Sequence, residues 1–338
     1  MARVSMQEVA LRAGVAPSSV SRVLSDHPNV SAVMRHRVLD AVAALGYEPD
    51  LLAQALRRGA TMTVGFAVGN ISNPVLAEIT FGAETHLRQA GYSMLLTNSM
   101  GQPDSDAENI RLLAQRRVDG MLISLSSEEW PSTIEAVKRA MLPVVLVERD
   151  LRVERRASAV LSDHEIGIDS AVRHLASFGH KRVALVNGPI EVLPARARAA
   201  ALRKVAKLMD MESTVRSGEF SSEHGERATK SLLAQSDRPT AILAGSNQIL
   251  VGVLRAIRKE GLKVPEDLSL VTCDEIPLAE FLDPPLATIE RNRFEMGTIA
   301  ATLLLELFSG SKPRVQRVPT TYIPTASVGP APQHLRTS

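Results

Sequence analysis

The sequence predicts three short helices at the N-terminus, a short linker helix, and an α/β region made of two doubly wound parallel sheets. Capping residues and apolar residues at helical spacing within the first 48 residues indicate the helices. Short apolar runs that alternate with helical stretches across residues 62–325 indicate parallel sheets covered by helices. We therefore expect a helical domain at 1–48, a linker helix at 49–60, an α/β domain at 61–328 and a flexible tail at 329–338.

The composition excludes several classes of protein. There are 39 Lys and Arg residues against 37 Asp and Glu, so the chain is not a uniformly basic binder, although this total says nothing about a local basic patch. The single cysteine, Cys273, excludes an internal disulfide and ends an apolar run, which favours a buried thiol over a nucleophile. The sequence has neither a signal-peptide pattern nor an apolar run of about 18 residues. We expect a soluble cytoplasmic protein without a membrane partner.

The first two helices form a tight pair. Ser5 and Glu8 make an S-x-x-E capping box, and Gly14 stands where a helix ends in the left-handed conformation. The second helix starts only three residues later, at Pro17, and two helices joined by so short a turn form a helix-turn-helix. A third helix follows Ser31. The expected core of this unit is Met6, Val9, Ala10, Ala13, Val20, Val23, Leu24, Met34, Val38, Ala41, Val42 and Leu45.

The second helix, PSSVSRVL, has a polar face without carboxylates. Ser18, Ser21 and Arg22 occupy this face, and such residues suit contact with DNA bases and phosphates. Ala16 cannot cap the helix, whereas Pro17 suits its first turn because proline lacks an amide hydrogen that would be unpaired there. We favour DNA binding over the alternative, a generic three-helix bundle with a polar surface.

Residues 47–61, YEPDLLAQALRRGAT, predict the linker helix. It runs between Pro49 and Gly59, with Leu52 and Leu56 on one small apolar face. Isolated helices shorter than about 12 residues are marginal in water. We therefore expect this helix to form only when a partner surface packs on it, which would make it a switch element. The alternative is a solvated linker that stays unfolded.

Strand-like apolar runs of the α/β region lie at 62–68, 92–98, 120–124, 143–147, 183–187, 241–244 and 268–271. They fall into two sets that divide near residue 160. We expect a first lobe from residues 61–160 and 290–322, and a second lobe from residues 161–289. In sheets of this type, ligands bind beyond the carboxyl ends of the strands, so a ligand cleft is expected between the lobes.

The α/β region carries no recognisable catalytic motif. We find no G-x-S-x-G, G-x-x-x-x-G-K-[ST], G-x-G-x-x-G or H-E-x-x-H pattern. His164, His174 and His180 lie near one another in sequence, but core or surface roles are more common for such residues than metal binding. We therefore expect no enzyme activity, no metal and no cofactor.

Several stretches, taken in order, resemble the LacI-GalR family of transcriptional repressors along nearly the whole chain. They include VALRAGVAPSSVSRVL (9–24), VSAVMRHRVLDAVAALGYEPDLLAQALRRG (30–59), GNISNPV (69–75), FGHKRVALVNGP (178–189), EGLKVPEDLSLVTCDE (260–275) and DPPLATI (283–289). The resemblance implies a homodimer that binds an inverted-repeat operator in double-stranded DNA through two helix-turn-helix units. It also implies a periplasmic-binding-protein-like region that holds a small sugar-like effector between its lobes.

The resemblance also implies which residues contact DNA and effector. Those expected at DNA are Ser5, Ala16, Pro17, Ser18, Ser21, Arg22, Asn29, Ser31, Ala53, Leu56 and Arg57. Among them, Pro17 and Ser18 correspond to positions that read bases, and Leu56 to one that wedges apart a base step in the minor groove. Those expected at the effector are Asn73, Glu148, Arg149, Asp163, Arg198, Asn247, Asp274 and Arg291. The alternative is that several of them support the site or join the lobes without touching the ligand.

The chain departs from the family pattern in the effector region. The departures are Ser246-Asn247 for the usual Asn-Asp, Val75 for an aromatic residue, Cys273-Asp274-Glu275 for Phe-Asp-Asp, and Glu148 for Asp. Arg291 and Arg293 add positive charge near the cleft. We therefore expect an effector with an anionic group, such as a sugar acid or sugar phosphate, rather than a neutral sugar. The alternative functions are a solute-binding receptor for transport, which shares the two-lobed fold, and an α/β enzyme.

Overall fold

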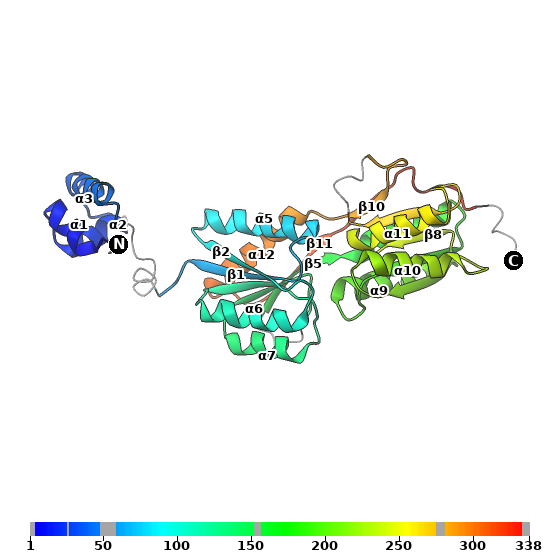
Figure 1. Ribbon diagram of the computed structural model, residues 1–338, viewed down its shortest axis with the longest axis horizontal. Helices are drawn as coiled ribbons and strands as arrows, with labels where there is room; N and C mark the ends of the chain where they lie inside the picture. Colours follow the sequence, from blue (N-terminus) through cyan, green and yellow to red (C-terminus); the bar gives the residue numbers. More distant parts are fainter. Residues whose placement is uncertain (1–3, 26, 48–58, 152–156, 275–280, 333–338) are drawn as a thin grey trace. The chain divides into compact units, whose positions relative to one another are not determined.

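The computed structural model describes residues 4–25, 27–47, 59–151, 157–274 and 281–332 (Figure 1). Contacts between residues divide the chain into two units, Met1–Thr61 and Met62–Ser338. Most of the linker helix expected at 49–60 lies outside the described residues, which resume at Gly59. Within the described part of the chain, no helix has the length and apolar character needed to cross a membrane.

The N-terminal unit contains three helices, α1 (Met6–Ala13), α2 (Pro17–Leu24) and α3 (Ala32–Leu45). The capping box predicted at α1 is confirmed, because the Ser5 side chain accepts from the Glu8 amide and the Glu8 carboxylate accepts from the Ser5 amide. Ser31 caps α3, whereas Ala16 offers α2 no side-chain hydrogen bond. All twelve side chains predicted for the core lie in one apolar cluster.

The second unit contains two six-stranded sheets, one in each lobe. The first sheet has the strand order β11-β5-β4-β3-β1-β2 and its pairs are all parallel. The second has the order β12-β10-β9-β8-β6-β7 and is parallel except for the β10–β12 pair. The first sheet comprises β1 (Thr63–Val68), β2 (Ser93–Asn98), β3 (Gly120–Ser124), β4 (Val144–Val147), β5 (Ala157–Asp163) and β11 (Val315–Pro319). The second comprises β6 (Arg182–Asn187), β7 (Glu212–Ser217), β8 (Ala241–Ala244), β9 (Ser269–Cys273), β10 (Ala287–Glu290) and β12 (Thr321–Ile323).

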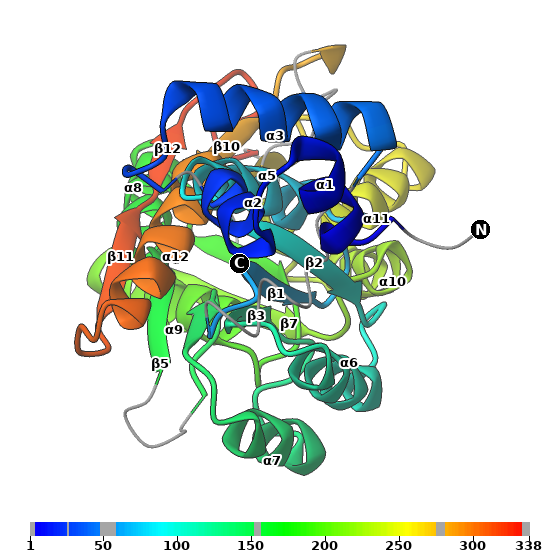
Figure 2. The same ribbon diagram turned by 90° about the vertical axis from the view of Figure 1, so that its left-hand side faces the viewer.

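Helices cover both faces of each sheet (Figures 1 and 2). In the first lobe, one face carries α5 (Pro74–Gln89) and α12 (Arg293–Phe308), and the other carries α6 (Pro103–Gln115) and α7 (Pro131–Ala140). In the second lobe, one face carries α8 (His164–Ser177) and α9 (Leu193–Leu208), and the other carries α10 (Ser222–Leu233) and α11 (Asn247–Lys259). Each lobe is therefore a three-layer structure with an apolar cluster on either side of its sheet.

The chain crosses between the two lobes three times. It leaves the first lobe between Asp163 and His164, returns to it after Glu290, and crosses again at Thr320, between β11 and β12. The Thr320 hydroxyl donates to the Asp163 carbonyl (2.6 Å) and accepts from the Gly167 amide (2.9 Å). The first and third crossings are therefore joined by hydrogen bonds.

These crossings differ from the lobe boundaries expected from the sequence. The first lobe extends through Asp163, close to the boundary expected at about residue 160, because β5 pairs with β4 and β11. The range 290–322 is divided between the lobes, because β12 pairs with β10 in the second sheet. The strands β5, β7, β10, β11 and β12 were not among the predicted runs. Most of them are short or polar, and their place in a sheet depends on partners that lie far away in sequence.

The segment expected to be a flexible tail from Gly329 begins as packed structure. The Gly329 amide donates to the Ser269 hydroxyl (3.1 Å), and the Ala331 amide donates to the Phe178 carbonyl (2.9 Å). Ala331 is also 4% exposed. These bonds extend the second lobe through Pro332, the last residue that the structure describes.

Two pairs of helices pack so closely that only glycine fits between them. A Cβ atom built at Gly82 of α5 would lie 2.2 Å from a backbone oxygen of α12, and one at Gly297 of α12 would lie 2.0 Å from a backbone oxygen of α5. Gly225 of α10 and Gly252 of α11 make the same arrangement in the second lobe, with corresponding distances of 2.3 and 2.0 Å. Because the obstructing atoms belong to backbone rather than to flexible side chains, neither pair can accept a methyl group without moving apart.

We expect Gly297→Ala to lower the free energy of unfolding by about 3 kcal/mol, because the new methyl group would overlap the backbone of α5. Helix propensity alone predicts the opposite sign, a gain of about 1 kcal/mol. Urea unfolding of the full chain measures the difference, with Gln89→Ala at an exposed position of α5 as the control. Unchanged or increased stability of Gly297→Ala would contradict the close contact.

Candidate functional site

The polar face of α2 is exposed. Pro17, Ser18 and Arg22 are exposed and Ser21 is half-buried, whereas the apolar residues Val20 and Val23 are buried in the core of the unit. The guanidinium of Arg22 makes no hydrogen bond or ion pair with any residue that the structure describes. Its donors, and the apolar ring of Pro17 at the start of the helix, are therefore available to a partner.

Arg37 of α3 fixes the turn that presents this face. Its Nη2 atom donates to the carbonyl oxygens of Ala13 (2.6 Å) and Gly14 (3.2 Å). Gly14 adopts the left-handed conformation, with φ of 62°, that lets the chain turn from α1 into α2. The charge of Arg37 therefore serves the turn between the two helices in addition to any contact with a partner.

The other residues predicted at DNA have varied surroundings. Ser5 is exposed, but its hydroxyl donates to the Glu8 carboxylate (2.8 Å), and a carboxylate beside it disfavours a phosphate there. Ser31 is exposed and accepts from the Met34 amide, and Asn29 and Ala16 are exposed. Ala53, Leu56 and Arg57 lie outside the described residues.

In the Met62–Ser338 unit, a cavity of about 400 Å³ lies between the two lobes. We call it the interlobe cavity. It is lined by residues that follow the carboxyl ends of β1, β3 and β4 in the first lobe and of β6, β8 and β9 in the second, where a cleft was expected. Of the eight residues predicted for the effector, six line it: Asn73, Glu148, Arg149, Arg198, Asp274 and Arg291.

Four of these six residues form a buried ionic network. Arg291 donates through Nη1 to Asp274, and its Nη2 lies 3.9 Å from an oxygen of Glu148. Arg198 lies 3.7 Å from Asp274 and donates to the Gly245 carbonyl (2.7 Å). Each of the four side chains is at most 6% exposed. Buried charges persist only when paired, so this network links Glu148 of the first lobe to Arg198 and Asp274 of the second.

The two carboxylates of the network stand on strained backbone. Glu148 and Asp274 follow β4 and β9, and their φ angles are 56° and 88°. Residues other than glycine rarely adopt a positive φ. Such residues cost about 1–3 kcal/mol each and cluster at binding sites, where the surrounding structure holds them in place.

Glu148 and His164 share the first-lobe end of the network. His164 Nε2 lies 3.3 Å from Glu148 Oε2, and both side chains are almost fully buried. Burial opposes ionisation of Glu148, but His164, Arg291 and the Ser162 amide together hold the pKa of Glu148 well below its usual range. Burial and the nearby Arg198 lower the pKa of His164 to about 4, in spite of the neighbouring carboxylate. His164 is therefore neutral at pH 7.

Two residues predicted at the effector do not line the cavity. Asp163 instead caps α8, where its side chain accepts from the Glu165 amide (3.3 Å). Asn247 is buried, and its side-chain amide donates to the side-chain oxygen of Asn73 (3.0 Å) in the first lobe. Asn247 therefore positions a lining residue across the lobes. Neither Asp163 nor Asn247 is among the residues that line the cavity, and their contact with an effector stays a prediction.

Several residues that line the interlobe cavity were not predicted from the sequence. They are Gly69, Asn70, Leu76, Met100, Gly101, Gln102, Ser124, Ser126, Pro189, Pro194, Glu219, Phe220, Ser221 and Gln248. Phe220 follows β7, whose sequence ESTVRS is too polar to indicate a strand, so the loop after it could not be placed. In the structure, Gly188 makes room for the Phe220 ring, because a Cβ atom at this position would lie 2.1 Å from the ring.

We expect the chain to lose up to about 3 kcal/mol of stability through His164 as the pH falls from about 6.5 to about 4. Between pH 6.5 and pH 4, His164 is protonated in the unfolded state but stays neutral in the folded state. Stability therefore rises with pH in this range and levels off above pH 6.5. His164→Gln should lose less stability over the same range in urea unfolding. The control is His86→Gln, at a half-buried histidine of α5. Identical pH profiles for wild type and His164→Gln would contradict the assignment.

Comparisons with known proteins match both units of the chain. A profile described as bacterial regulatory proteins, lacI family, matches residues 5–50, and one described as a periplasmic binding protein-like domain matches residues 172–328. The ribose operon repressor of Escherichia coli (strain K12) is 31% identical over 323 residues, which cover 94% of this chain and 97% of that protein.

Solved structures agree with this relationship. The lac repressor dimer bound to operator and the anti-inducer ONPF has a TM-score of 0.86 and 26% identity, with 97% of this chain and 100% of that chain covered. A LacI family regulator from Enterococcus faecium with bound ribose has a TM-score of 0.69 and 27% identity, with 79% and 99% covered. These relatives are regulators, so neither the transport receptor nor the enzyme alternative is supported. The chain belongs to the LacI family and is a DNA-binding transcriptional regulator.

Proposed function

We propose that this protein is a cytoplasmic repressor that binds an inverted-repeat operator as a homodimer, and that a small anionic sugar derivative in the interlobe cavity controls its binding. The exposed face of α2, with Pro17, Ser18 and Arg22, would lie in the major groove. Ala53, Leu56 and Arg57, outside the described residues, would contact the minor groove and its phosphates.

The observation that carries the effector proposal is the set of arginines at the interlobe cavity. The Nε atoms of Arg198 and Arg291 have no hydrogen-bond partner among the described residues, and Arg149 brings a third guanidinium to the wall. Glu148 and Asp274 offset the charges of Arg198 and Arg291, and Arg149 lies near the carboxylates of Glu128, Glu148 and Asp106. The two open Nε donors would nevertheless bond a carboxylate or phosphate on the ligand, because guanidinium groups form charge-assisted hydrogen bonds with such anions.

The size and the other polar groups of the cavity favour a sugar-like body for this ligand. About 400 Å³ lies within the range of cavities that hold small molecules. Ser124 Oγ is buried with no partner among the described residues, and Gln248 lines the opposite lobe. Both could bond sugar hydroxyls. The ribose held by the related regulator from Enterococcus faecium supports the same class of ligand.

An exposed edge of the first lobe offers a contact surface for the proposed homodimer. β2 is the last strand of its sheet, and Leu95 and Leu96 on this strand are 41% and 42% exposed. Met100, just beyond the strand, is 72% exposed. An edge strand with exposed apolar side chains invites pairing with another chain, and a second copy of this chain offers the matching surface. The relative crystallised on its operator is also a dimer.

An effector that contacts both walls of the cavity would favour the closed arrangement of the lobes. It can shift the equilibrium only by the difference between its affinities for the closed and open arrangements. The linker helices of the dimer would then form or separate with the lobes. Whether the effector releases the operator or promotes binding depends on which arrangement holds those helices on DNA.

Gel-shift titration on inverted-repeat DNA, selected from the sequence that flanks the gene, tests the operator proposal. We expect specific binding whose affinity falls steeply with salt, because phosphate contacts release counterions. Ser18→Ala should weaken operator binding about tenfold and leave non-specific binding unchanged, because a base contact is lost. Ser19→Ala, the neighbouring residue of α2, is the matched control. Equal effects of Ser18→Ala on operator and random DNA would contradict a base-reading role.

Thermal-shift measurements with gluconate, ribose 5-phosphate and neutral ribose test the effector proposal. We expect the acidic compounds to raise the melting temperature. At a ligand concentration a hundred times the dissociation constant, binding should stabilise the folded protein by about 3 kcal/mol. Arg198→Lys should abolish most of this shift, because lysine keeps the charge but loses the paired donors. Arg203→Lys, at an exposed position of the same helix, should not. Stabilisation by neutral ribose alone would contradict the proposal.

A further inference from the structure

The helix α9 of the second lobe has no cap of its own. Its N-cap residue is Val192, whose side chain cannot accept a hydrogen bond. A helix start leaves its first amides unpaired, and an uncapped start costs stability. The partner that fills this place comes from the other lobe.

Glu128 of the first lobe supplies the missing acceptor. It lies in the loop between β3 and α7, and its Oε1 accepts from the Leu193 amide at the first position of α9 (2.8 Å). Its Oε2 accepts from Arg196 Nη2, one turn further along (3.0 Å). The Glu128 side chain is only 3% exposed. A carboxylate at a helix start also meets the positive end of the helix dipole.

An apolar contact accompanies these hydrogen bonds. The Leu193 side chain packs against the apolar cluster of the first lobe that lies between its sheet and helices α6 and α7. The first turn of α9 is therefore fixed in the first lobe by its amide and by its side chain, although the rest of the helix belongs to the second lobe.

The same helix forms part of the interlobe cavity. Pro194 and Arg198 of α9 line the cavity, within five residues of the Leu193 amide that Glu128 holds. Any change in the angle between the lobes must break the Glu128 bonds or move the arginine that faces the ligand. The cap and the cavity are therefore mechanically coupled through one helix.

We propose that Glu128 is a positioning residue for regulation. It caps α9 across the lobes and thereby stabilises the closed arrangement, which is the one described above and the one that the effector recognises. This inference rests on the proposed function. Without the cap, the open arrangement gains population, effector affinity falls, and operator affinity shifts in the direction opposite to the shift that the effector causes. That sign relation holds whether the effector releases or promotes DNA binding.

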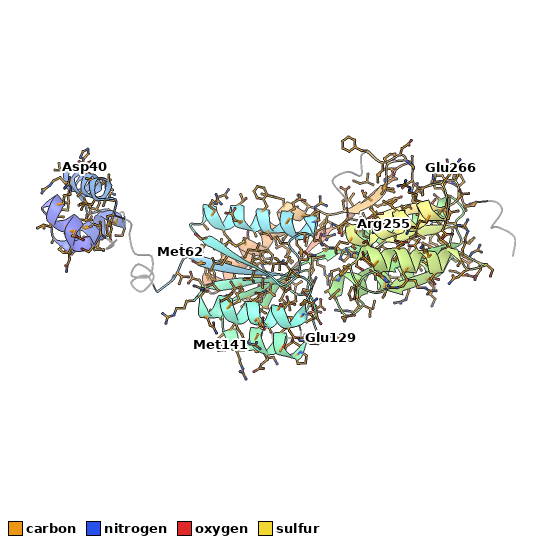
Figure 3. The ribbon with its side chains drawn as sticks, in the orientation of Figure 1. Asp40, Met62, Glu129, Met141, Arg255 and Glu266 are labelled. Carbon is orange, nitrogen blue, oxygen red and sulfur yellow. The ribbon has the colours of Figure 1, made fainter. Side chains whose placement is uncertain are left out.

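Hydrogen exchange on the full-length protein tests the cap directly. In Glu128→Ala, the peptide that contains the Leu193 amide should exchange about tenfold faster, because the acceptor is gone. Glu128→Gln should fall between wild type and Glu128→Ala, since an amide oxygen still accepts but carries no charge. The matched control is Glu129→Ala at the neighbouring residue, which is exposed and labelled in Figure 3.

Operator binding tests the regulatory role. Gel shifts with the inverted repeat, with and without gluconate or ribose 5-phosphate, should show a change of about fivefold in operator affinity for Glu128→Ala, opposite in sign to the ligand effect. Arg196→Ala removes the bond to Glu128 and a second bond, from Nη1 to the Glu191 carbonyl (2.7 Å) within the second lobe. Because the Arg196 side chain is 44% exposed, this second variant should fold and should shift affinity in the same direction by less. In the Glu128→Ala background, Arg196→Ala should add nothing.

The outcomes separate this inference from the proposed function. If wild type binds operator and responds to ligand but Glu128→Ala matches Glu129→Ala in exchange and in affinity, the inference is overturned. It is also overturned if the Glu128 and Arg196 effects simply add. If wild type ignores the inverted repeat or every acidic ligand, the proposed function fails, while faster exchange at Leu193 in Glu128→Ala would still establish the cap.

Discussion

The charge buried between the lobes constrains the whole Met62–Ser338 unit. Glu148 belongs to the first lobe, Arg198 and Asp274 belong to the second, and Arg291 follows the strand where the chain crosses back. Each charge is tolerated because the others are beside it, and an unpaired buried ion costs several kcal/mol. The lobes can therefore separate only if water or a ligand replaces the lost partners. A ligand that enters this network must take part in its charge balance. The network therefore selects ligands by charge, and it also holds the two lobes together.

The helical unit could be predicted almost completely from the sequence because its determinants are local. The Ser5–Glu8 capping box, the left-handed Gly14 and the apolar spacing all act within a few residues of one another. The sheets were predictable only in part. Continuous apolar runs such as those of β1 and β3 were recognised, whereas β7 carries the polar sequence ESTVRS and becomes a strand because it pairs with β6.

The cavity shows a similar division. Glu148, Arg198 and Asp274 were expected at the effector because their motifs resemble those of the family, and these three do line the cavity. Asp163 and Asn247 carry equally suggestive side chains, but one caps a helix and the other bonds Asn73 across the lobes. Such roles depend on neighbours brought together by the fold. The role of Glu128 was invisible for the same reason, since its partners lie some 65 residues away along the chain.

The bond network of Thr320 has a mechanical consequence for the lobes. Three independent crossings between the lobes would let each lobe twist, slide and bend relative to the other. Thr320 joins the third crossing to the first through the Asp163 carbonyl and the Gly167 amide, so these two crossings form one connected unit. A movement of one lobe against the other must therefore carry these two crossings together or break the Thr320 bonds.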